Sequence, residues 1–414
     1  MSRKVLIIGA GASGRGHVGQ LALESGYDVT FVEKDRDLVE GLRKSKKYVV
    51  HLVSAQPRDF VVDRFEILHL GEPEAVYRAL VSSPLIFTVV GPNNLKDVAN
   101  YLRPMLERWL RAGNDTGGQD SKNVLCCENM DRSSTVFKGM LLEGFPPELA
   151  GALDARVGFP DTMIARVVAK PKDPLRLLGE EYSEWTADRK ALRGADVPAI
   201  KTLEFVDEQA RYLQRKLYIH NTGHATLGYL GFVKGYAYIH EAAQDPAILD
   251  VTAKAIEESG WAIQKEHGFS QGVIGAYRQA LLDKCPCAEL PDEITRVVRE
   301  PLRKLGPAER FFGPVRLLLK HGRKPDYILH GLCAALLADV PGDAESARLR
   351  RLMEAGGVRK VLQALEVRIP AEVLHKIESL LPSIREAFLR LPGSAREDSE
   401  MPPGGVRDLP GRPL

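Results

Sequence analysis

The first half of the chain alternates short, almost wholly apolar runs with amphipathic stretches. The apolar runs are rich in Val, Ile and Leu, as in buried strands, whereas the stretches between them place apolar residues three and four positions apart, as in helices. Strand-like and helix-like segments in this order predict βαβ units and a mainly parallel sheet. The segments span residues 4–11, 16–26, 27–35, 83–91, 95–113 and 123–129, and less regular strands are expected within 155–161, 164–170 and 175–185.

The second half of the chain has a different pattern. From about residue 203 the apolar residues recur three and four positions apart with almost no strand signal, as in 246–268. We therefore expect an α/β domain over residues 1–202 and a mostly α-helical domain over 203–392. Residues 393–414 are rich in Pro, Gly and charge, have no apolar period, and are predicted to form a disordered tail.

Composition and charge exclude several classes of protein. The 414 residues are enough for two to three domains. Lys and Arg number 57 against 55 Asp and Glu, so no global field would recruit nucleic acid or a membrane surface, although a local anion site is compatible with this balance. No run of about 18 apolar residues is present and the N-terminus has no signal-peptide pattern, so we expect a cytoplasmic protein. The oligomeric state is left open.

The cysteines do not indicate a disulfide framework. They number five, an odd count, and two of them are adjacent. Cys285 and Cys287 could bind a metal or cycle between redox states, but no second pair lies nearby in sequence. We expect no metal site there.

A glycine-rich loop joins the first predicted strand to the next helix. Gly9, Gly11 and Gly14 form the pattern G-x-G-x-x-G. Gly9 permits a tight turn, Gly11 lets the backbone approach a pyrophosphate, and Gly14 lets helix and strand pack closely. The N-terminus of the helix adds free N–H groups and a partial positive charge. The pattern predicts a Rossmann-type dinucleotide-binding domain, with a ligand-free glycine turn as the alternative.

An acidic residue follows the loop at the spacing that such domains use. Glu33 ends the second apolar strand about 20 residues after the loop, where a carboxylate can bind the ribose 2′-hydroxyl and repel a 2′-phosphate. NAD is therefore favoured over NADP, although Lys34, next to Glu33, is compatible with binding of NADP. A later strand ends at Gly91 and Pro92, which either form the floor of the nicotinamide half of the crevice or make a simple turn.

The stretch KLYIHNTGHA, from Lys216, offers two kinds of site. On a regular helix, at about 100° per residue, both arrangements are possible. His220 and His224 have the i, i+4 spacing of a helical zinc site. A metalloprotease helix, however, carries a glutamate beside the first histidine, where this chain has Asn221, and no third ligand stands out. The pattern therefore disfavours zinc.

The other arrangement fits the oxidation of an alcohol by hydride transfer, which needs a base for the hydroxyl proton and a donor for the developing alkoxide. Lys216 can be the base if burial and positive neighbours lower its pKa from about 10.4 toward 7–8. Asn221 can donate to the oxygen, and His224 can hold the lysine or a substrate hydroxyl. The alternative is a half-exposed helix with an unremarkable polar face. His220 is expected to be structural.

Taken together, the motifs resemble those of the polyol-specific long-chain dehydrogenases. The resemblance reaches to about residue 390, and its most specific motif is K-x4-N-x2-H. It implies a Rossmann-type domain, a helical domain and a metal-independent site between them. The other motifs on which the resemblance rests are GAGASGRGHVG, VGPNNL, CCENMDRSS, VGFPDTMIARV, EYSEW, RKLYIHNTGHATLGYLG and REPLRKLGPAERFFGP.

The resemblance assigns roles to individual residues. Lys216 resembles the general base of the family, and Asn221 and Asn129 resemble the two asparagines that stabilise the oxyanion. His224 resembles the histidine that positions the substrate. Glu128 either relays the proton of the lysine to solvent or is a salt-bridge partner at the end of a strand.

One departure from the family pattern concerns the substrate. Ala165 and Arg166 stand where the family has Asp-Arg, so the substrate, rather than the reaction type, is put in doubt. Arg303, Lys304 and Arg310 are candidates for binding a phosphate, since guanidinium groups pair bidentately with phosphate oxygens; otherwise they form a solvated basic helix end.

The expected function is NAD-dependent interconversion of a hexitol phosphate and a ketose phosphate. The alternatives are the same chemistry on an unphosphorylated polyol or a hexuronate, and a dinucleotide-binding protein without catalytic activity. The joint presence of a candidate base and two candidate asparagines argues against the last of these.

Overall fold

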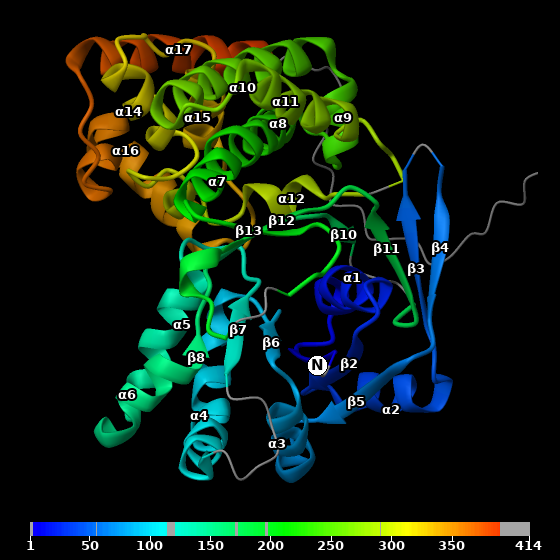
Figure 1. The fold of residues 1–414 in the computed structure, drawn as a ribbon. Coiled ribbons are helices and arrows are strands. Elements are labelled where there is room, and N and C mark those ends of the chain that lie inside the picture. The colour runs from blue at the N-terminus through cyan, green and yellow to red at the C-terminus, as the bar shows by residue number, and fades with distance from the viewer. Residues whose placement is uncertain are drawn as a thin grey trace, which may run out of the picture.

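The computed structural model describes residues 3–54, 56–113, 121–169, 173–194, 198–289 and 291–389. Figure 1 shows two bodies: an α/β domain that holds the N-terminus, and a helical domain stacked on it. The tail predicted over 393–414 lies outside the described residues. Within the ranges above, no helix is both long and apolar enough to traverse a lipid bilayer.

The α/β domain is built on a six-stranded parallel sheet in the order β5-β2-β1-β6-β7-β8. The central strand is buried on both faces: Val5 and Ile7 belong to the core on one side, Leu6 and Ile8 to the core on the other. The strand order reverses between β1 and β6, which is where such sheets bind ligands. The strands are β1 (Lys4–Ile8), β2 (Asp28–Glu33), β5 (Phe65–His69), β6 (Leu85–Thr88), β7 (Lys122–Cys126) and β8 (Val157–Gly158).

Helices cover both faces of this sheet. Their starts follow local chemistry: the Asp35 side chain accepts hydrogen bonds from two backbone N–H groups of α2, and Pro73 occupies the first turn of α3, where its missing N–H costs nothing. The helices are η1 (Gly14–Gly19, π-helical), α1 (Gln20–Glu24), α2 (Arg36–Ser45), α3 (Pro73–Ser82), η2 (Pro92–Asn94), α4 (Leu95–Arg111), α5 (Ser133–Leu142) and α6 (Pro147–Arg156).

The other strands form two small sheets: β12 and β13 lie between the parallel sheet and the helical domain, whereas β3 and β4 lie at the side of the α/β domain (Figure 1). Their orders are β10-β11-β3-β4 and β13-β12-β9. The strands are β3 (Tyr48–Val53), β4 (Arg58–Val62), β9 (Thr162–Ala165), β10 (Val168–Ala169), β11 (Arg176–Glu180), β12 (Glu184–Asp188) and β13 (Leu203–Val206), with η4 (Arg189–Ala191) after β12. Because β13 follows residue 202, the last strand of these sheets lies just beyond the boundary expected from the sequence. The boundary itself stays a prediction.

The helical domain packs around α8, whose small residues allow close approach of neighbouring helices. A side chain at Gly231 would come within 2.7 Å of Ala242 and Ile294. The predicted fold class, a Rossmann-type α/β domain followed by a mostly α-helical domain, is confirmed. The helices are α7 (Gln209–Arg215), η5 (Lys216–His220), α8 (Asn221–Lys234), α9 (Ile239–Gln244), α10 (Pro246–His267), α11 (Gln271–Lys284), α12 (Ile294–Val298), α13 (Pro301–Lys304), α14 (Phe312–Lys320), α15 (Ile328–Leu337), α16 (Ala344–Ala364) and α17 (Ala371–Leu389).

Candidate active site

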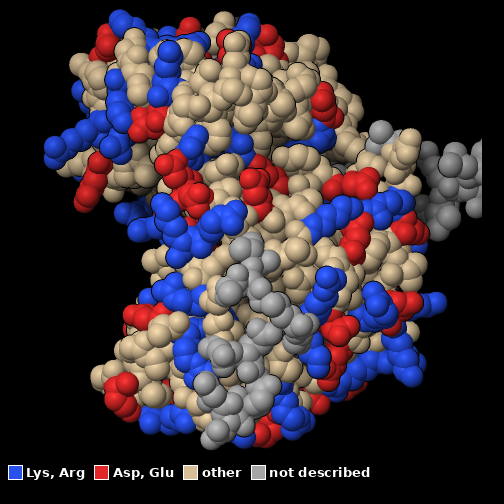
Figure 2. Space-filling view, in the orientation of Figure 1, with Lys and Arg blue, Asp and Glu red and all other residues tan. Residues whose placement is uncertain are grey.

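A cavity of about 1320 Å³ lies between the two domains. Pro92, Glu128 and Asn129 line it from the carboxyl ends of β6 and β7, and Lys216 and Asn221 line it from the helical domain. Figure 2 shows an indentation at the left edge of the molecule between the two domains, with Lys and Arg side chains above and below it. The cavity therefore lies at the sheet edge where the reversed strand order predicts a ligand.

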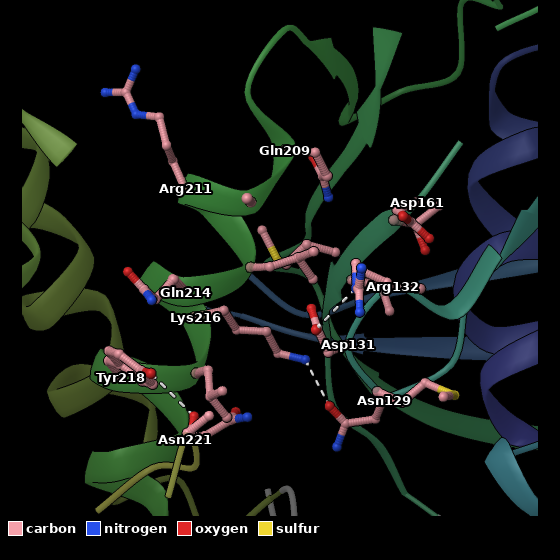
Figure 3. A pocket seen from close by; sticks show the side chains of 18 of the residues that line it. Asn129, Asp131, Arg132, Asp161, Gln209, Arg211, Gln214, Lys216, Tyr218 and Asn221 are labelled. Atoms are coloured by element: carbon pink, nitrogen blue, oxygen red, sulfur yellow. Dashed lines mark hydrogen bonds and ion pairs between the residues drawn. The ribbon is translucent and has the colours of Figure 1, made fainter. Parts of the chain in front are cut away.

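Lys216 is the residue that joins the two sides of the cavity. Its Nζ donates a hydrogen bond to Oδ1 of Asn129 at 3.0 Å (Figure 3). Burial, together with the positive charges of Arg310 and Lys284, lowers the pKa of the amine to about 8, against the opposing effect of Glu184. The lysine therefore has the lowered pKa that a general base near neutral pH needs.

The local backbone differs from the regular helix that the spacing suggested. Residues Lys216–His220 form a π-helical turn between α7 and α8. Such widened turns are rare and are found often at functional sites. The geometry of a regular helix, at about 100° per residue, therefore does not apply through this stretch, yet Lys216 and Asn221 line the same cavity.

Glu128 holds the loop that follows β6. Its carboxylate accepts hydrogen bonds from Thr88 Oγ1 at 3.1 Å and from the backbone N–H groups of Val90 at 3.0 Å and Gly91 at 2.7 Å. Burial raises the pKa of this carboxyl. Within the described residues the carboxylate therefore has backbone and hydroxyl donors, and not the ion pair that the sequence had offered as an alternative. A role in proton relay stays a prediction.

The two histidines of the stretch lie outside the set of residues that line the cavity. His224 Nε2 lies 2.8 Å from Oδ2 of Asp292, whose other oxygen accepts from Arg296. Although burial opposes it, the contact with His224 and the charge of Arg296 hold the pKa of Asp292 at about 2. Both ring nitrogens of His220 are buried and have no hydrogen-bond partner in the described part of the chain. The structure does not bring His224 to the cavity wall.

The three candidate phosphate ligands are separated by the structure. Arg303 and Arg310 line the cavity, and Arg310 Nη2 lies 3.1 Å from Glu309 Oε2. Lys304 instead is buried, and its Nζ donates to the carbonyl of Val297 at 2.6 Å and to a second backbone carbonyl. Arg303 and Lys304 are neighbours on the short helix α13, and their side chains point in directions about 100° apart.

The glycine loop has the shape that a dinucleotide requires. Gly9 has a φ of 104°, and a side chain there would overlap the carbonyl oxygen of Val89. A side chain at Gly14 would overlap the carbonyl oxygen of Gly9, so strand and helix meet without room for one. Among the described residues, no atom beyond the chain neighbours of Gly11 lies within 4 Å of the place where its side chain would be. The space over Gly11 fits the approach of a pyrophosphate.

Glu33 borders this loop. Its Oε2 accepts the backbone N–H of Ala10 at 2.8 Å, and its Oε1 accepts those of Lys34 at 2.8 Å and Asp35 at 3.1 Å. The carboxylate is thereby fixed at the end of β2 beside the glycine loop. A group so placed would hold the adenosine ribose of a bound dinucleotide.

Ala165, where the resemblance leads one to expect an aspartate, ends β9 and is buried. Its partner across the antiparallel pair is Glu184 of β12. The Glu184 carboxylate forms an ion pair with Arg215, the residue before the candidate base. Sequence reasoning missed this carboxylate, although the motif EYSEW contains it. It also missed other residues that line the cavity, among them Asp131, Arg132, Asp161, Gln209, Arg211 and Gln214 (Figure 3).

A parallel sheet with a glycine loop, a helical domain and a lysine between them make up the arrangement of a two-domain dehydrogenase of the Rossmann type. The chain belongs to the mannitol dehydrogenase family: the family's Rossmann domain matches residues 3–201, and its C-terminal domain matches residues 209–363. The two matches together therefore cover both the α/β domain and the helical domain.

Relatives extend over nearly the whole chain. The mannitol-1-phosphate 5-dehydrogenase of Thermoanaerobacter pseudethanolicus is 32% identical over 93% of this chain and 99% of its own. That of Bacillus subtilis is 33% identical over 90% of this chain and 97% of its own. The resemblance drawn from the motifs is confirmed, and so, at the level of the family, is the prediction of an NAD-dependent polyol dehydrogenase.

Solved structures with this fold include two polyol dehydrogenases. Pseudomonas fluorescens mannitol 2-dehydrogenase, in a ternary complex with NAD and D-mannitol, superposes with a TM-score of 0.72 at 17% identity, covering 93% of this chain and 92% of that one. A substrate-free D-sorbitol dehydrogenase superposes with a TM-score of 0.78 at 17% identity, covering 93% of each chain. At this identity the likeness concerns the fold alone.

Proposed function

We propose that this protein interconverts a hexitol phosphate and its ketose phosphate with NAD, of the mannitol 1-phosphate and fructose 6-phosphate kind. The observation that carries the proposal is the contact of 3.0 Å between Lys216 Nζ and Asn129 Oδ1 in the cavity between the domains. The names of the relatives that are 32% and 33% identical support the choice of substrate.

The chemistry follows from where the side chains lie. NAD, when bound, supplies the acceptor for the hydride that leaves the carbinol carbon. Lys216 in its neutral form takes the hydroxyl proton of the polyol, so an O–H bond breaks and an N–H bond forms. Because Oδ1 of Asn129 faces the lysine, its amide N–H groups are left to stabilise the developing alkoxide, together with those of Asn221.

The choice of NAD rests on Glu33. Its carboxylate is held beside the glycine loop by three backbone N–H groups, where it would accept a hydrogen bond from a ribose 2′-hydroxyl. A 2′-phosphate in the same place would meet a like charge. Gly9, Gly11 and Gly14 would hold the pyrophosphate.

Arg303 and Arg310 would bind the phosphate of the substrate. Both guanidinium groups line the cavity, and both lie near Glu309, at 3.9 Å and 3.1 Å. Arg303 also pairs with Glu300 at 2.7 Å, so a bound phosphate would compete with Glu300 and Glu309 for the two guanidinium groups. Lys304 drops out of the proposed set because its amine is committed to backbone carbonyls.

The proposed reaction uses a lysine base and no metal. His224, one member of the possible zinc pair, is engaged with Asp292. Groups of three or more potential ligands placed to hold a metal ion are not found in the ranges that the structure describes. A cytoplasmic location remains a proposal from the sequence.

The deciding experiment follows NADH oxidation with fructose 6-phosphate, beside fructose and a hexuronate. We expect activity with the phosphorylated sugar, loss of activity in Lys216→Ala, and no effect of EDTA. Lys324→Ala, a change at an exposed lysine, is the matched control and should retain activity. Inhibition by EDTA would contradict the metal-free mechanism.

Two other outcomes correspond to the alternative functions. Activity with fructose or the hexuronate but not with the phosphate would indicate a changed substrate, for which Ala165 is the motivating observation. Binding of NADH without turnover of any of the three substrates would indicate a dinucleotide-binding protein.

A further inference from the structure

One buried carboxylate ties together the ends of two neighbouring strands that border the cavity. Glu128 follows β7, is 4% exposed, and directly precedes Asn129, the partner of the candidate base. Its oxygens accept hydrogen bonds from Thr88 Oγ1, at the end of β6, and from the backbone N–H groups of Val90 and Gly91 just after it. The end of β7 is therefore fastened to the segment that follows β6.

The three donors require an acceptor on both carboxylate oxygens. Oε1 accepts from Thr88 and from Val90 at 3.0 Å, and Oε2 accepts from Gly91 at 2.7 Å. An ionised carboxylate offers only acceptors, whereas a carboxamide has one acceptor oxygen and an NH2 group. Whichever way a glutamine at position 128 turned its amide, the NH2 group would face a backbone N–H. Although burial raises the pKa of Glu128, the hydrogen bonds oppose that change and favour the ionised form.

The fastened segment has a backbone shape that depends on such contacts. Gly91 has a φ of 85° and a ψ of 149°, a conformation that favours glycine. Asn94 holds the other side of the turn: its side-chain amide donates to the carbonyl of Val90 at 2.7 Å, and its backbone N–H donates to that of Gly91 at 3.1 Å. Glu128 supplies the matching acceptors for the N–H groups of the same two residues.

This segment lies between the glycine loop and the candidate base. The Val89 N–H donates to the carbonyl of Ile8 at 2.8 Å, and a side chain at Gly9 would lie 2.4 Å from the carbonyl oxygen of Val89. At its other end, Pro92 lines the cavity together with Lys216. A dinucleotide with its pyrophosphate on the glycine loop and its reactive ring near Lys216 would therefore cross this segment.

We propose that Glu128 is a positioning residue for the nicotinamide half of the cofactor: by holding the N–H groups of Val90 and Gly91, it fixes the surface on which the nicotinamide rests. Because Asn129 is the next residue, the same stretch of backbone sets the place of the ring relative to the amide that contacts Lys216. In this role Glu128 stays ionised and transfers no proton. The inference rests on the proposed place of the dinucleotide, and it is independent of which sugar is the substrate.

The test compares two ligands that share the adenosine and the pyrophosphate but differ in the nicotinamide. NADH carries that ring and ADP-ribose lacks it. Their Kd values are measured by isothermal titration calorimetry with the full-length wild type and with Glu128→Gln. We expect the variant to bind NADH roughly fivefold or more weakly, since a backbone N–H of the segment loses its acceptor, and to bind ADP-ribose as the wild type does.

Two other carboxylates of the chain provide matched controls. Glu33→Gln changes the carboxylate proposed to hold the adenosine ribose, so it should weaken the binding of NADH and ADP-ribose alike. Glu258→Gln changes a buried carboxylate that accepts backbone N–H groups at the start of α15, and it should leave both affinities unchanged.

The outcomes separate this inference from the proposed function. Unchanged NADH binding in Glu128→Gln, as expected if the residue only relayed a proton, would overturn the inference, and so would equal weakening of both ligands. A selective loss of NADH affinity would support it even if fructose 6-phosphate were not turned over. A wild type that bound neither ligand would overturn the proposed cofactor site and this inference with it.

A second variant reaches the same segment without changing the carboxylate. Gly91→Ala adds a methyl group that meets no described atom beyond its chain neighbours, but the φ of 85° is unfavourable for alanine. If Glu128→Gln does not fold, Gly91→Ala should still weaken NADH binding while ADP-ribose binding is retained. Equal affinities of this variant and the wild type for NADH would overturn the inference.

Discussion

The side-chain amine of Lys216 lies 3.0 Å from Oδ1 of Asn129, a residue 87 positions earlier in the chain and in the other domain. The helical domain supplies the amine, and the end of strand β7 supplies the amide. Neither domain holds the pair alone, so the docking of the two domains creates the site (Figure 3).

The lowered pKa of Lys216 predicts opposite pH profiles for the two directions of the reaction. Oxidation needs the neutral amine, so kcat/KM for the polyol phosphate should rise with pH and level off above about 8. Reduction needs the ammonium, so its rate should fall above the same value. Initial rates across this range would check the prediction, and an oxidation limb near the ordinary lysine pKa of about 10.4 would contradict it.

Replacing Asn129 should affect rate and pH profile separately. Asn129→Ala removes an amide donor and should lower kcat by roughly 100- to 1000-fold, as for an oxyanion-hole donor. Asn129→Asp also places a carboxylate beside the Lys216 ammonium, so the oxidation limb should move to higher pH. Comparison of the two profiles provides the check. Equal limbs in both variants would show that residue 129 does not contact the lysine during turnover.

Alanine substitutions at two glycines of the loop should have different effects on stability and on NADH binding. Gly14→Ala puts a methyl group against the Gly9 carbonyl oxygen and should destabilise the fold by about 1–3 kcal/mol. The methyl group of Gly11→Ala contacts no other part of the described structure, so the fold should be unaffected while NADH binds roughly tenfold or more weakly. Thermal unfolding and fluorescence titration with NADH would separate the effects. Tight NADH binding by Gly11→Ala would argue against this loop as the pyrophosphate site.

Arg310 and Lys304 provide a matched pair of basic residues. Arg310→Ala should raise KM for fructose 6-phosphate roughly 10- to 100-fold, as expected for the loss of a charged hydrogen bond, without the same effect on any residual activity with fructose. Lys304→Met should leave KM unchanged and alter only stability, because its amine binds backbone carbonyls. Steady-state kinetics of the two variants would decide. A large KM effect of Lys304→Met would place the phosphate elsewhere.

Lys122 should make stability depend on pH. Its amine is buried in β7, donates to the carbonyls of Val81 and Ser83 at 2.9 and 3.1 Å, and has its pKa lowered to about 7 by burial and by the charge of Arg156. Between about pH 7 and 10 the unfolded chain holds a proton that the folded chain lacks, so this residue makes stability rise with pH. Below pH 7 the lysine is protonated in both the folded and the unfolded chain, so the full free-energy cost of burying its charge lowers stability.

Lys122→Met should flatten that rise. Denaturant midpoints of wild type and variant at pH 7 and pH 9 would show it as a smaller difference for the variant. An equal pH dependence in both proteins would mean that Lys122 is protonated alike in the folded and unfolded chains.

The sequence alone determined the features that depend on local pattern. Gly9, Gly11 and Gly14 follow an apolar strand, and this order already implies the tight loop that the structure contains, because backbone conformation there is set by neighbouring residues. The spacing of Lys216 and Asn221 likewise places both on one stretch of helix. Fold class follows from the same kind of periodicity.

Only the tertiary structure decided which side chains meet. The Lys304 side chain is buried in the protein, whereas Arg303 and Arg310 line the cavity, although all three residues are close in sequence. It also placed Glu184 against Arg215, across 31 positions of the chain. The burial of a residue and the charges around it depend on how elements distant in sequence pack together. The local pattern of hydrophobic and polar residues does not specify that packing.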